Sequence, residues 1–177
     1  MEKCKGLVHI ICGDGKGKTT AAIGLSIRAA GRKKKVLIAQ FLKSDDSGEL
    51  VILNQIEEIT MMPIEKFFGF TWQMSDEQKR EAKDYYNAMF HTVIQKVSEE
   101  EYDLLVLDEI LAAYEYGFVD HISLINFLTS KPEHLEVVMT GRNPAQELCE
   151  RADYISEVKK IKHPYEKGVP ARKGIEF

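Results

Sequence analysis

The sequence GDGKGKTT occupies residues 13–20 and lies between a short apolar run and a helix-like segment. The preceding run, residues 7–12 (LVHIIC), has the length and apolar character of a strand that is buried on both faces. Residues 19–30 carry small and apolar side chains at helical spacing, and Gly31 follows as a C′ glycine. A glycine-rich turn between a strand and a helix N-terminus is the setting of a phosphate-binding loop.

This loop has the residue types that polyphosphate binding requires. Its glycines let backbone N–H groups converge on one anion, and the helix N-terminus adds free donors and partial positive charge. Lys18 is placed to reach the outer phosphates, and the Thr19 hydroxyl is placed to bind Mg²⁺. The residues predicted to hold the triphosphate of ATP are Gly13, Asp14, Gly15, Lys16, Gly17, Lys18, Thr19 and Thr20.

The spacing departs from the usual G-x-x-x-x-G-K-[ST] pattern. Counting back from Gly17, the first glycine should be residue 12, but Cys12 stands there. Starting from Gly13 makes the loop one residue shorter. We therefore expect it to hold the phosphates differently from the loops of ordinary kinases and ATPases. The alternative is a glycine-rich turn that binds nothing, which the agreement of strand, lysine, threonine and helix disfavours.

A second apolar run ends in two carboxylates. Residues 102–109 read YDLLVLDE, and a strand here would carry Asp108 and Glu109 to the carboxyl edge of a sheet, where open α/β folds bind ligands. Either carboxylate could hold Mg²⁺, or Mn²⁺ in its place, directly or through water. A helix N-cap is the alternative explanation of the pair, and the nearby phosphate loop favours the metal role.

Strand-like and helix-like segments alternate along the whole chain. Further strands are predicted at 36–41, 59–64, 104–107, 136–140 and 154–160, and further helices at 75–97, 111–116, 122–128 and 143–151. This alternation predicts an α/β fold of the P-loop (RecA-like) type, with a mainly parallel sheet and helices on both faces. No repeat or linker divides the sequence, so residues 1–177 are expected to form a single domain.

The composition argues against several classes of protein. With 24 Lys and Arg against 28 Asp and Glu, the net charge of -4 lacks the basic excess of a general nucleic-acid binder. No apolar run approaches the length of a membrane span. Cys4, Cys12 and Cys149 form no CxxC pair, which disfavours a zinc site or a disulfide framework. We therefore expect a cytoplasmic protein that binds neither nucleic acid nor membrane.

The chain resembles the ATP:corrinoid adenosyltransferases of the CobA/BtuR type, in order and over nearly its whole length. The motifs that carry the resemblance are GDGKGKTTAAIG (13–24), RAAG (28–31), QFLK (40–43), GE (48–49), GFTW (69–72), LDE (107–109), PEHLE (132–136), TGR (140–142), AD (152–153), KHP (162–164), Gly168 and ARKGIE (171–176). The family is similar in having the shortened phosphate loop, so the departure in spacing supports the resemblance.

The resemblance implies transfer of the 5′-deoxyadenosyl group of ATP to the Co(I) of a reduced corrinoid such as cobalamin, with release of triphosphate. This reaction serves the synthesis or salvage of adenosylcobalamin. The loop would then grip the whole triphosphate as the leaving group, with Lys18 stabilising its charge. A homodimer and a flavoprotein electron donor are implied by the same resemblance.

Further site residues also follow from the resemblance. The pair Phe70 and Trp72 would displace the lower axial ligand of cobalt, which eases reduction of Co(II) to Co(I). Arg28 and Arg142 would lie near the nucleotide. Gln40 and Glu49 are weaker candidates for the same region.

Two other functions stay open on the residues alone. An ordinary P-loop ATPase or small-molecule kinase would release ADP or AMP and would need a catalytic base near the γ-phosphate. A non-catalytic ATP- or corrinoid-binding protein would bind without turnover. The aromatic cluster at residues 67–72 would, from its spacing alone, suit a core or a dimer contact, and the family resemblance favours the corrin role instead.

Overall fold

The six strands of the sheet run parallel in the order β3-β2-β4-β5-β1-β6. The computed structural model describes residues 5–176. The strands are β1 (Val8–Cys12), β2 (Val36–Gln40), β3 (Ile59–Met61), β4 (Leu104–Asp108), β5 (Glu136–Thr140) and β6 (Tyr154–Glu157). Because all strands are parallel, their carboxyl ends meet at one edge, and the chain segments that leave this edge lie close together.

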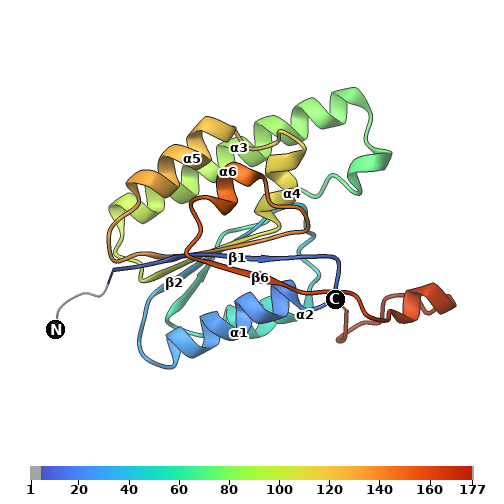
Figure 1. Cartoon of the computed structure of the whole chain (residues 1–177), viewed down its shortest axis with the longest axis horizontal. Coiled ribbons are helices and arrows are strands. Elements are labelled where there is room, and N and C mark those ends of the chain that lie inside the picture. The colour runs from blue at the N-terminus through green and yellow to red at the C-terminus, as the bar shows by residue number, and fades with distance from the viewer. Residues whose placement is uncertain (1–4, 177) are drawn as a thin grey trace.

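Helices cover both faces of the sheet (Figure 1). One face carries α1 (Lys18–Ala30) and α2 (Gly48–Leu53), and the other carries α3 (Asp76–Glu99), α4 (Ile110–Glu115), α5 (His121–Ser130) and α6 (Gln146–Cys149). Two 3-10 helices, η1 (Thr71–Gln73) and η2 (Pro164–Lys167), lie in the connecting segments. This arrangement confirms the predicted α/β fold with a parallel sheet between two helical layers.

Side chains of each strand alternate between the two layers. On β4, Leu105 and Leu107 join the core beneath α3, whereas Leu104 and Val106 join the core beneath α1. Burial on both faces explains why the strands are continuous apolar runs in the sequence. By the same alternation, the last residue of β4, Asp108, faces the layer of α1, whose N-terminus follows the phosphate loop.

Every predicted strand and helix is present, with changes at several ends. A capping box begins α3: the Ser75 hydroxyl accepts from the Gln78 N–H at 3.2 Å, and the Gln78 amide oxygen accepts from the Ser75 N–H at 2.9 Å. Strand β3 ends at Met61 rather than residue 64, because Pro63 has no N–H for the ladder. Helix α6 begins at Gln146, three residues later than predicted, and the sequence did not indicate α2.

The end of α1 also differs from expectation. Gly31 keeps a right-handed conformation, with φ at −61°. The left-handed residue is Lys33, with φ at 61°, and its N–H donates to the Ala30 carbonyl at 2.8 Å. The helix therefore ends through a turn that places the left-handed residue beyond the glycine.

The phosphate loop packs against the segment that follows β6. The Gly15 N–H donates to the Val158 carbonyl at 2.8 Å, and the Asp14 carboxylate accepts from the Lys160 N–H at 2.9 Å. A Cβ atom would lie 2.4 Å from the Val158 oxygen at Gly13 and 2.7 Å at Gly15. Gly13 also has φ at 108°. Both positions therefore require glycine, and β6 ends early because its continuation backs the loop.

Within residues 5–176 no helix is long and apolar enough to cross a membrane. Cys12 is buried and Cys149 is half-buried, and both are free thiols. Cys4 lies outside the described residues.

Gly15→Ala is expected to lower stability, because its methyl group cannot fit 2.7 Å from the Val158 oxygen unless the loop and residues 158–160 separate. The expected loss in the free energy of unfolding is about 1–3 kcal/mol, measured by denaturant or thermal unfolding.

Gly24→Ala is the matched control. Gly24 lies within α1 with nothing within 4 Å of an added Cβ, so alanine should raise stability by about 0.5–1 kcal/mol. Equal effects of the two substitutions would contradict the packing role of Gly15.

Candidate active site at the phosphate loop

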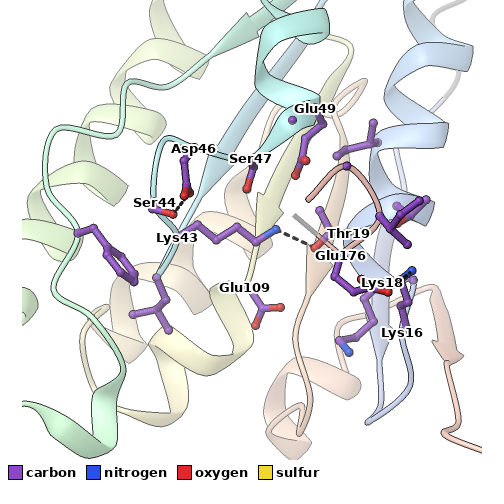
Figure 2. A pocket seen from close by; sticks show the side chains of 18 of the residues that line it. Lys16, Lys18, Thr19, Lys43, Ser44, Asp46, Ser47, Glu49, Glu109 and Glu176 are labelled. Carbon is purple, nitrogen blue, oxygen red and sulfur yellow. Dashed lines mark hydrogen bonds and ion pairs between the residues drawn. The ribbon is translucent and has the colours of Figure 1, made fainter. Parts of the chain in front are cut away.

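A cleft of about 810 Å³ opens beside the phosphate loop (Figure 2). Its walls come from loop residues 15–20, from most of the segment 42–49 after β2, from Glu109 after β4 and from residues 174–176. Its volume lies within the range typical of small-molecule sites. Four segments that are far apart in the sequence thus converge at the carboxyl edge of the sheet.

The loop residues divide into two groups. Gly15, Lys16, Gly17, Lys18, Thr19 and Thr20 line the cleft. Gly13 and Asp14 instead hold the loop in place: the Gly13 N–H donates to the Arg142 carbonyl at 3.1 Å, and the Asp14 carboxylate is occupied by the Lys160 N–H. That hydrogen bond lowers the pKa of Asp14 below its usual range. Asp14, predicted to bind the nucleotide, therefore braces the loop.

The two loop lysines are held by groups of this chain. The Lys18 ammonium donates to the Gly15 carbonyl at 2.9 Å, across its own loop. The Lys16 ammonium lies 3.3 Å from a carboxylate oxygen of Glu176. The Arg172 guanidinium also contacts Glu176, and these contacts hold the pKa of Glu176 down, at about 2. Glu176 is therefore ionised, and it places a negative charge at the mouth of the loop.

A row of buried polar side chains follows the carboxyl ends of three neighbouring strands. Gln40, Asp108 and Thr140 are the last residues of β2, β4 and β5, and each is at most 2% exposed. The Thr140 hydroxyl donates to Asp108 Oδ1 at 2.6 Å, and Gln40 Nε2 donates to Asp108 Oδ2 at 3.2 Å. The Glu109 N–H donates to Thr140 Oγ1 at 2.9 Å. These bonds satisfy a carboxylate that would otherwise be costly to bury.

Thr19 and Lys43 complete the surroundings of Asp108. The Thr19 hydroxyl lies 3.0 Å and 3.2 Å from the two carboxylate oxygens. The Lys43 ammonium lies 2.6 Å from Asp108 Oδ2 and donates to Thr19 Oγ1 at 2.9 Å. Figure 2 shows the Lys43 side chain lying across the cleft toward Thr19. The negative charge of Asp108 is thus paired with a lysine from the segment that follows the neighbouring strand β2.

Glu109 lies in the same cleft, but its carboxyl group has different surroundings from that of Asp108. Its backbone is left-handed, with φ at 59°, and its side chain is half-buried beneath Lys43 (Figure 2). Burial raises the pKa of Glu109, the Asp108 carboxylate raises it further, and the charges of Lys43 and Lys18 oppose the shift. Of the two predicted metal-binding carboxylates, Asp108 is the one bonded to Thr19, and Glu109 stands beside that pair.

The residues around Asp108 have the chemistry of a site for a hard cation. The Thr19 hydroxyl and the Asp108 carboxylate are oxygen donors, which Mg²⁺ prefers. The amide oxygen of Gln40 is buried beside them without a hydrogen-bond partner. Within residues 5–176 no group of three or more His, Cys, Asp and Glu could hold a metal ion by itself. A magnesium ion here would take its other ligands from phosphates and water, as it commonly does.

The aromatic segment between β3 and α3 is partly anchored and partly exposed. Phe68 and Met74 are buried, whereas Phe70 and Trp72 are 56% and 74% exposed. The Phe70 and Trp72 rings stack with centroids 4.6 Å apart and an interplanar angle of 14°. Phe70 also lines the cleft together with the loop residues. A core role is therefore wrong for this pair, which forms an apolar platform at the rim of the cleft.

The two predicted arginines lie in different places. Arg142 follows β5 beside the loop, and its charge adds to the lowering of the Asp14 pKa by the Lys160 N–H and opposes the rise of the Glu109 pKa. Arg28 lies in the last turn of α1, roughly 15 Å along the helix from Lys18. It lines a separate cavity of about 310 Å³ with Lys5 and Arg32. The structure therefore does not bring Arg28 to the loop of its own chain.

Several residues of the site were given no role by the sequence reasoning. Lys43 and Thr140 directly contact Asp108, and Ile175 and Glu176 close one side of the cleft. A signal for the first two was present, since Thr140 ends the predicted strand 136–140 and Lys43 follows the predicted strand 36–41 by two residues. Gln40 and Glu49, the weaker candidates, lie at the same cleft: Gln40 contacts Asp108, and Glu49 lines the cleft.

Comparison with known proteins identifies one family. The sequence profile described as ATP:corrinoid adenosyltransferase BtuR/CobO/CobP matches residues 4–177. The corrinoid adenosyltransferase of Pseudomonas aeruginosa is 32% identical over 175 residues, which cover 98% of this chain and 84% of that protein. The enzymes of Salmonella typhimurium and Escherichia coli K12 are 31% and 32% identical, with 98% of this chain and 86% of each relative covered.

Solved structures of lower identity share the fold. The cytoplasmic domain of EssC superimposes with a TM-score of 0.56 at 18% identity, over 95% of this chain and 34% of that chain. The Hef helicase domain of Pyrococcus furiosus gives 0.50 at 13% identity, over 96% and 39%. The chain thus spans little more than a third of these solved chains, and the likeness concerns the α/β fold alone.

Thr140→Val keeps the shape of the side chain but removes the hydroxyl that bonds Asp108 and the Glu109 N–H. The Glu109 N–H loses its acceptor and the buried Asp108 carboxylate loses one of its four donors, so the free energy of unfolding should fall by about 1–3 kcal/mol. Binding of ATP with Mg²⁺, measured by calorimetry, should weaken about tenfold, since Asp108 loses one of the groups that orient it.

Thr140→Ser retains the hydroxyl and is the control, with an expected loss of stability under about 1 kcal/mol. A valine variant that matched wild type in both stability and nucleotide affinity would show that the Thr140 hydroxyl has no part in the site.

Proposed function

The chain belongs to the ATP:corrinoid adenosyltransferase family, and we propose that its residues 13–20 hold the triphosphate of ATP while Phe70 and Trp72 receive the corrin. The activity of the family is transfer of an adenosyl group from ATP to a corrinoid, a step of cobalamin biosynthesis. The observation that carries the proposal is that Phe70 lines the same cleft as Lys18 and Thr19. Both substrates can therefore meet in one cavity.

The reaction sets the requirements on the protein. The Co(I) centre of the corrinoid substrate donates an electron pair to C5′ of ATP, a Co–C bond forms, and the C5′–O bond breaks. The electrons of the broken bond leave with the triphosphate. No nucleophile from the protein is required, so the protein contributes position and charge stabilisation. Attack opposite the leaving oxygen requires the corrin and the phosphate loop to lie on opposite sides of C5′.

The phosphate loop is suited to stabilise the negative charge of the leaving triphosphate. Triphosphate carries several negative charges, and Lys16, Lys18 and Lys43 all line the cleft beside the N-terminus of α1. Donors that are fixed before the reaction stabilise developing charge most effectively. The loop is fixed in this sense, because the Val158 carbonyl and the Lys160 N–H hold it from behind.

We propose Mg²⁺, or Mn²⁺, as the metal that accompanies the nucleotide. Thr19 and Asp108 would hold it, and Glu109 would contact it directly or through water. What supports this is the oxygen chemistry of the donors and the unpartnered amide oxygen of Gln40. The metal would supply charge neutralisation of the triphosphate.

We propose that the stacked pair of Phe70 and Trp72 forms the apolar surface beneath the corrin. Neither side chain offers a donor atom to cobalt, so a corrin resting on them would lose its lower axial ligand without a replacement. Gly69, with φ at 78°, turns the chain so that Phe68 stays buried while Phe70 points outward. The pair therefore supports reduction of Co(II) to Co(I) rather than the transfer itself.

The family likeness extends the proposal to a homodimer, a cytoplasmic location and a flavoprotein as electron donor. What supports an oligomer is the exposed edge strand β6, on which Tyr154 and Ile155 are half exposed. Unpaired edge strands with apolar side chains commonly pair or are covered.

One assay separates this function from an ATPase, a kinase or a binding protein. The protein is mixed with ATP, Mg²⁺ and chemically reduced cobalamin, and the spectrum and phosphate products are followed. Adenosyl transfer requires loss of the Co(I) spectrum together with release of triphosphate. Release of ADP and free phosphate alone, or binding without turnover, would refute the proposal.

Lys18→Ala is expected to lower kcat/KM for ATP by at least about 100-fold, because a charge aimed at the leaving group is lost. The loss should appear whether the assay begins from Co(I) or Co(II). Lys96→Ala, which removes a lysine from the far helix α3, should leave the rate unchanged. Full activity of the Lys18 variant would show that the triphosphate binds elsewhere.

Trp72→Ala is expected to reduce the rate from Co(II) about tenfold more than the rate from chemically prepared Co(I), since the ring acts on the axial ligand. Tyr165→Ala is the matched control, because Tyr165 is exposed to the same 74% but belongs to η2 and not to the aromatic segment that carries Phe70. An equal loss from both cobalt states would remove the ligand-displacement role of Trp72.

A further inference from the structure

Lys43 occupies an unusual position for a lysine of a phosphate-loop protein. Its ammonium lies 2.6 Å from Asp108 Oδ2 and 2.9 Å from Thr19 Oγ1. In P-loop proteins these two residue types, the loop Ser/Thr and the acidic residue at the end of the neighbouring apolar strand, are the ones that hold Mg²⁺. A cation belonging to the protein thus sits between the two groups that would bind the metal.

The backbone on both sides of this contact is held in a rare conformation. Leu42 and Glu109 are both left-handed, with φ at 56° and 59°. One precedes Lys43 after β2, and the other follows Asp108 after β4. The Phe41 N–H donates to the Asp108 carbonyl at 2.9 Å and joins the two turns. Non-glycine residues with positive φ persist where the surroundings enforce them, often at functional sites. The fold therefore aims Lys43 at Asp108 through two strained turns.

The lysine and a metal ion cannot both occupy this place. Mg²⁺ binds oxygen at roughly 2.0–2.1 Å, so an ion bonded to Thr19 and Asp108 would lie where the ammonium now makes its contacts. Like charges at that separation in a partly buried site repel strongly. The Lys43 side chain is 21% exposed, and the cleft beside it is open, so the ammonium is free to swing away from Asp108.

The triphosphate is the natural new partner of the displaced ammonium. Lys43 lines the same cleft as residues 15–20, and its side chain points across that cleft (Figure 2). Phosphate oxygens held by the loop would lie within the sweep of its flexible stem, and charge-assisted bonds to them would replace those to Asp108.

We propose that Lys43 holds the metal position between Thr19 and Asp108 in the nucleotide-free protein and moves onto the triphosphate when the metal–nucleotide complex binds. The inference rests on the proposed function, since it takes the loop as the triphosphate site. Lys43 then serves twice: it neutralises buried Asp108 before the substrate arrives, and it adds a positive charge to the leaving group afterwards. It also disfavours binding of metal alone, so that metal and nucleotide enter together.

The variant Lys43→Met tests both parts of the proposal, the competition with the metal and the contact with the triphosphate. Both are measured as binding affinities in the absence of corrinoid. The affinity of the nucleotide-free protein for Mn²⁺, measured from the EPR signal of free Mn²⁺, should rise about tenfold or more because the competing ammonium is gone. The affinity for inorganic triphosphate with Mg²⁺, measured by calorimetry, should fall about tenfold or more because a charged contact is lost. Unchanged or weaker Mn²⁺ binding overturns the first half, and unchanged triphosphate binding overturns the second.

Two further variants keep the result interpretable. Lys96→Met removes a lysine of similar exposure on α3, whose ammonium lies 2.5 Å from a carboxylate oxygen of Glu100. In this variant both affinities should stay at wild-type values. Lys43→Gln retains a hydrogen-bond donor for Asp108 and replaces the methionine variant if that one unfolds; it must show the same two shifts.

Failure of the proposed function is recognised separately. If wild-type protein binds inorganic triphosphate and Lys18→Ala does not, the loop is the triphosphate site, and a negative result at Lys43 counts against Lys43 alone. If Lys18→Ala binds as wild type does, the loop assignment itself fails, and the inference about Lys43 falls with it.

Discussion

The site depends on one constraint, which is that the carboxylate of Asp108 is buried at the carboxyl edge of the sheet and must be satisfied there. Its side chain is 2% exposed, and four groups reach it: Thr140, Gln40, Thr19 and Lys43. Each comes from a different element, namely β5, β2, α1 and the turn after β2. Burying a carboxylate without such partners would cost several kcal/mol, so the requirement to satisfy Asp108 aligns three strands and the first turn of a helix.

The same constraint underlies the proposed exchange of Lys43 between Asp108 and the triphosphate. A carboxylate that is neutralised by a lysine is stable in the absence of ligand, and the lysine stem allows its charge to be relocated. When the nucleotide binds, Lys43 then exchanges its ion pair with Asp108 for one with the triphosphate, and Asp108 is never left without a cation. The negative Glu176 beside Lys16 plays a comparable part at the mouth of the loop, where it pairs a lysine that would otherwise face solvent.

The shortened loop is stabilised from outside rather than by its own length. Gly13 and Gly15 approach the Val158 backbone so closely that side chains would not fit, and Asp14 bonds the Lys160 N–H. The segment after β6 therefore acts as a rigid backing for the loop. Such a loop suits a reaction in which the whole triphosphate departs, because the donors are set before the C5′–O bond breaks. Phe70, which stacks on Trp72, lines the same cavity, where we propose that the pair receives the corrin.

Much of this protein was determined by local sequence. Strands buried on both faces produce continuous apolar runs, and glycine, lysine and threonine at fixed spacing identify a phosphate loop, so the fold class and residues 15–20 of the site were predictable. Helix ends and the contacts of Arg28, Asp14, Lys43 and Thr140 were decided only by tertiary structure. Strand order and register bring Gln40 opposite Asp108, and side-chain alternation turns both toward Thr19. The contacts among Thr19, Lys43, Gln40, Asp108 and Thr140 join residues from 24 to 89 positions apart. Local spacing carries no information about these contacts, because they exist only once the sheet has formed.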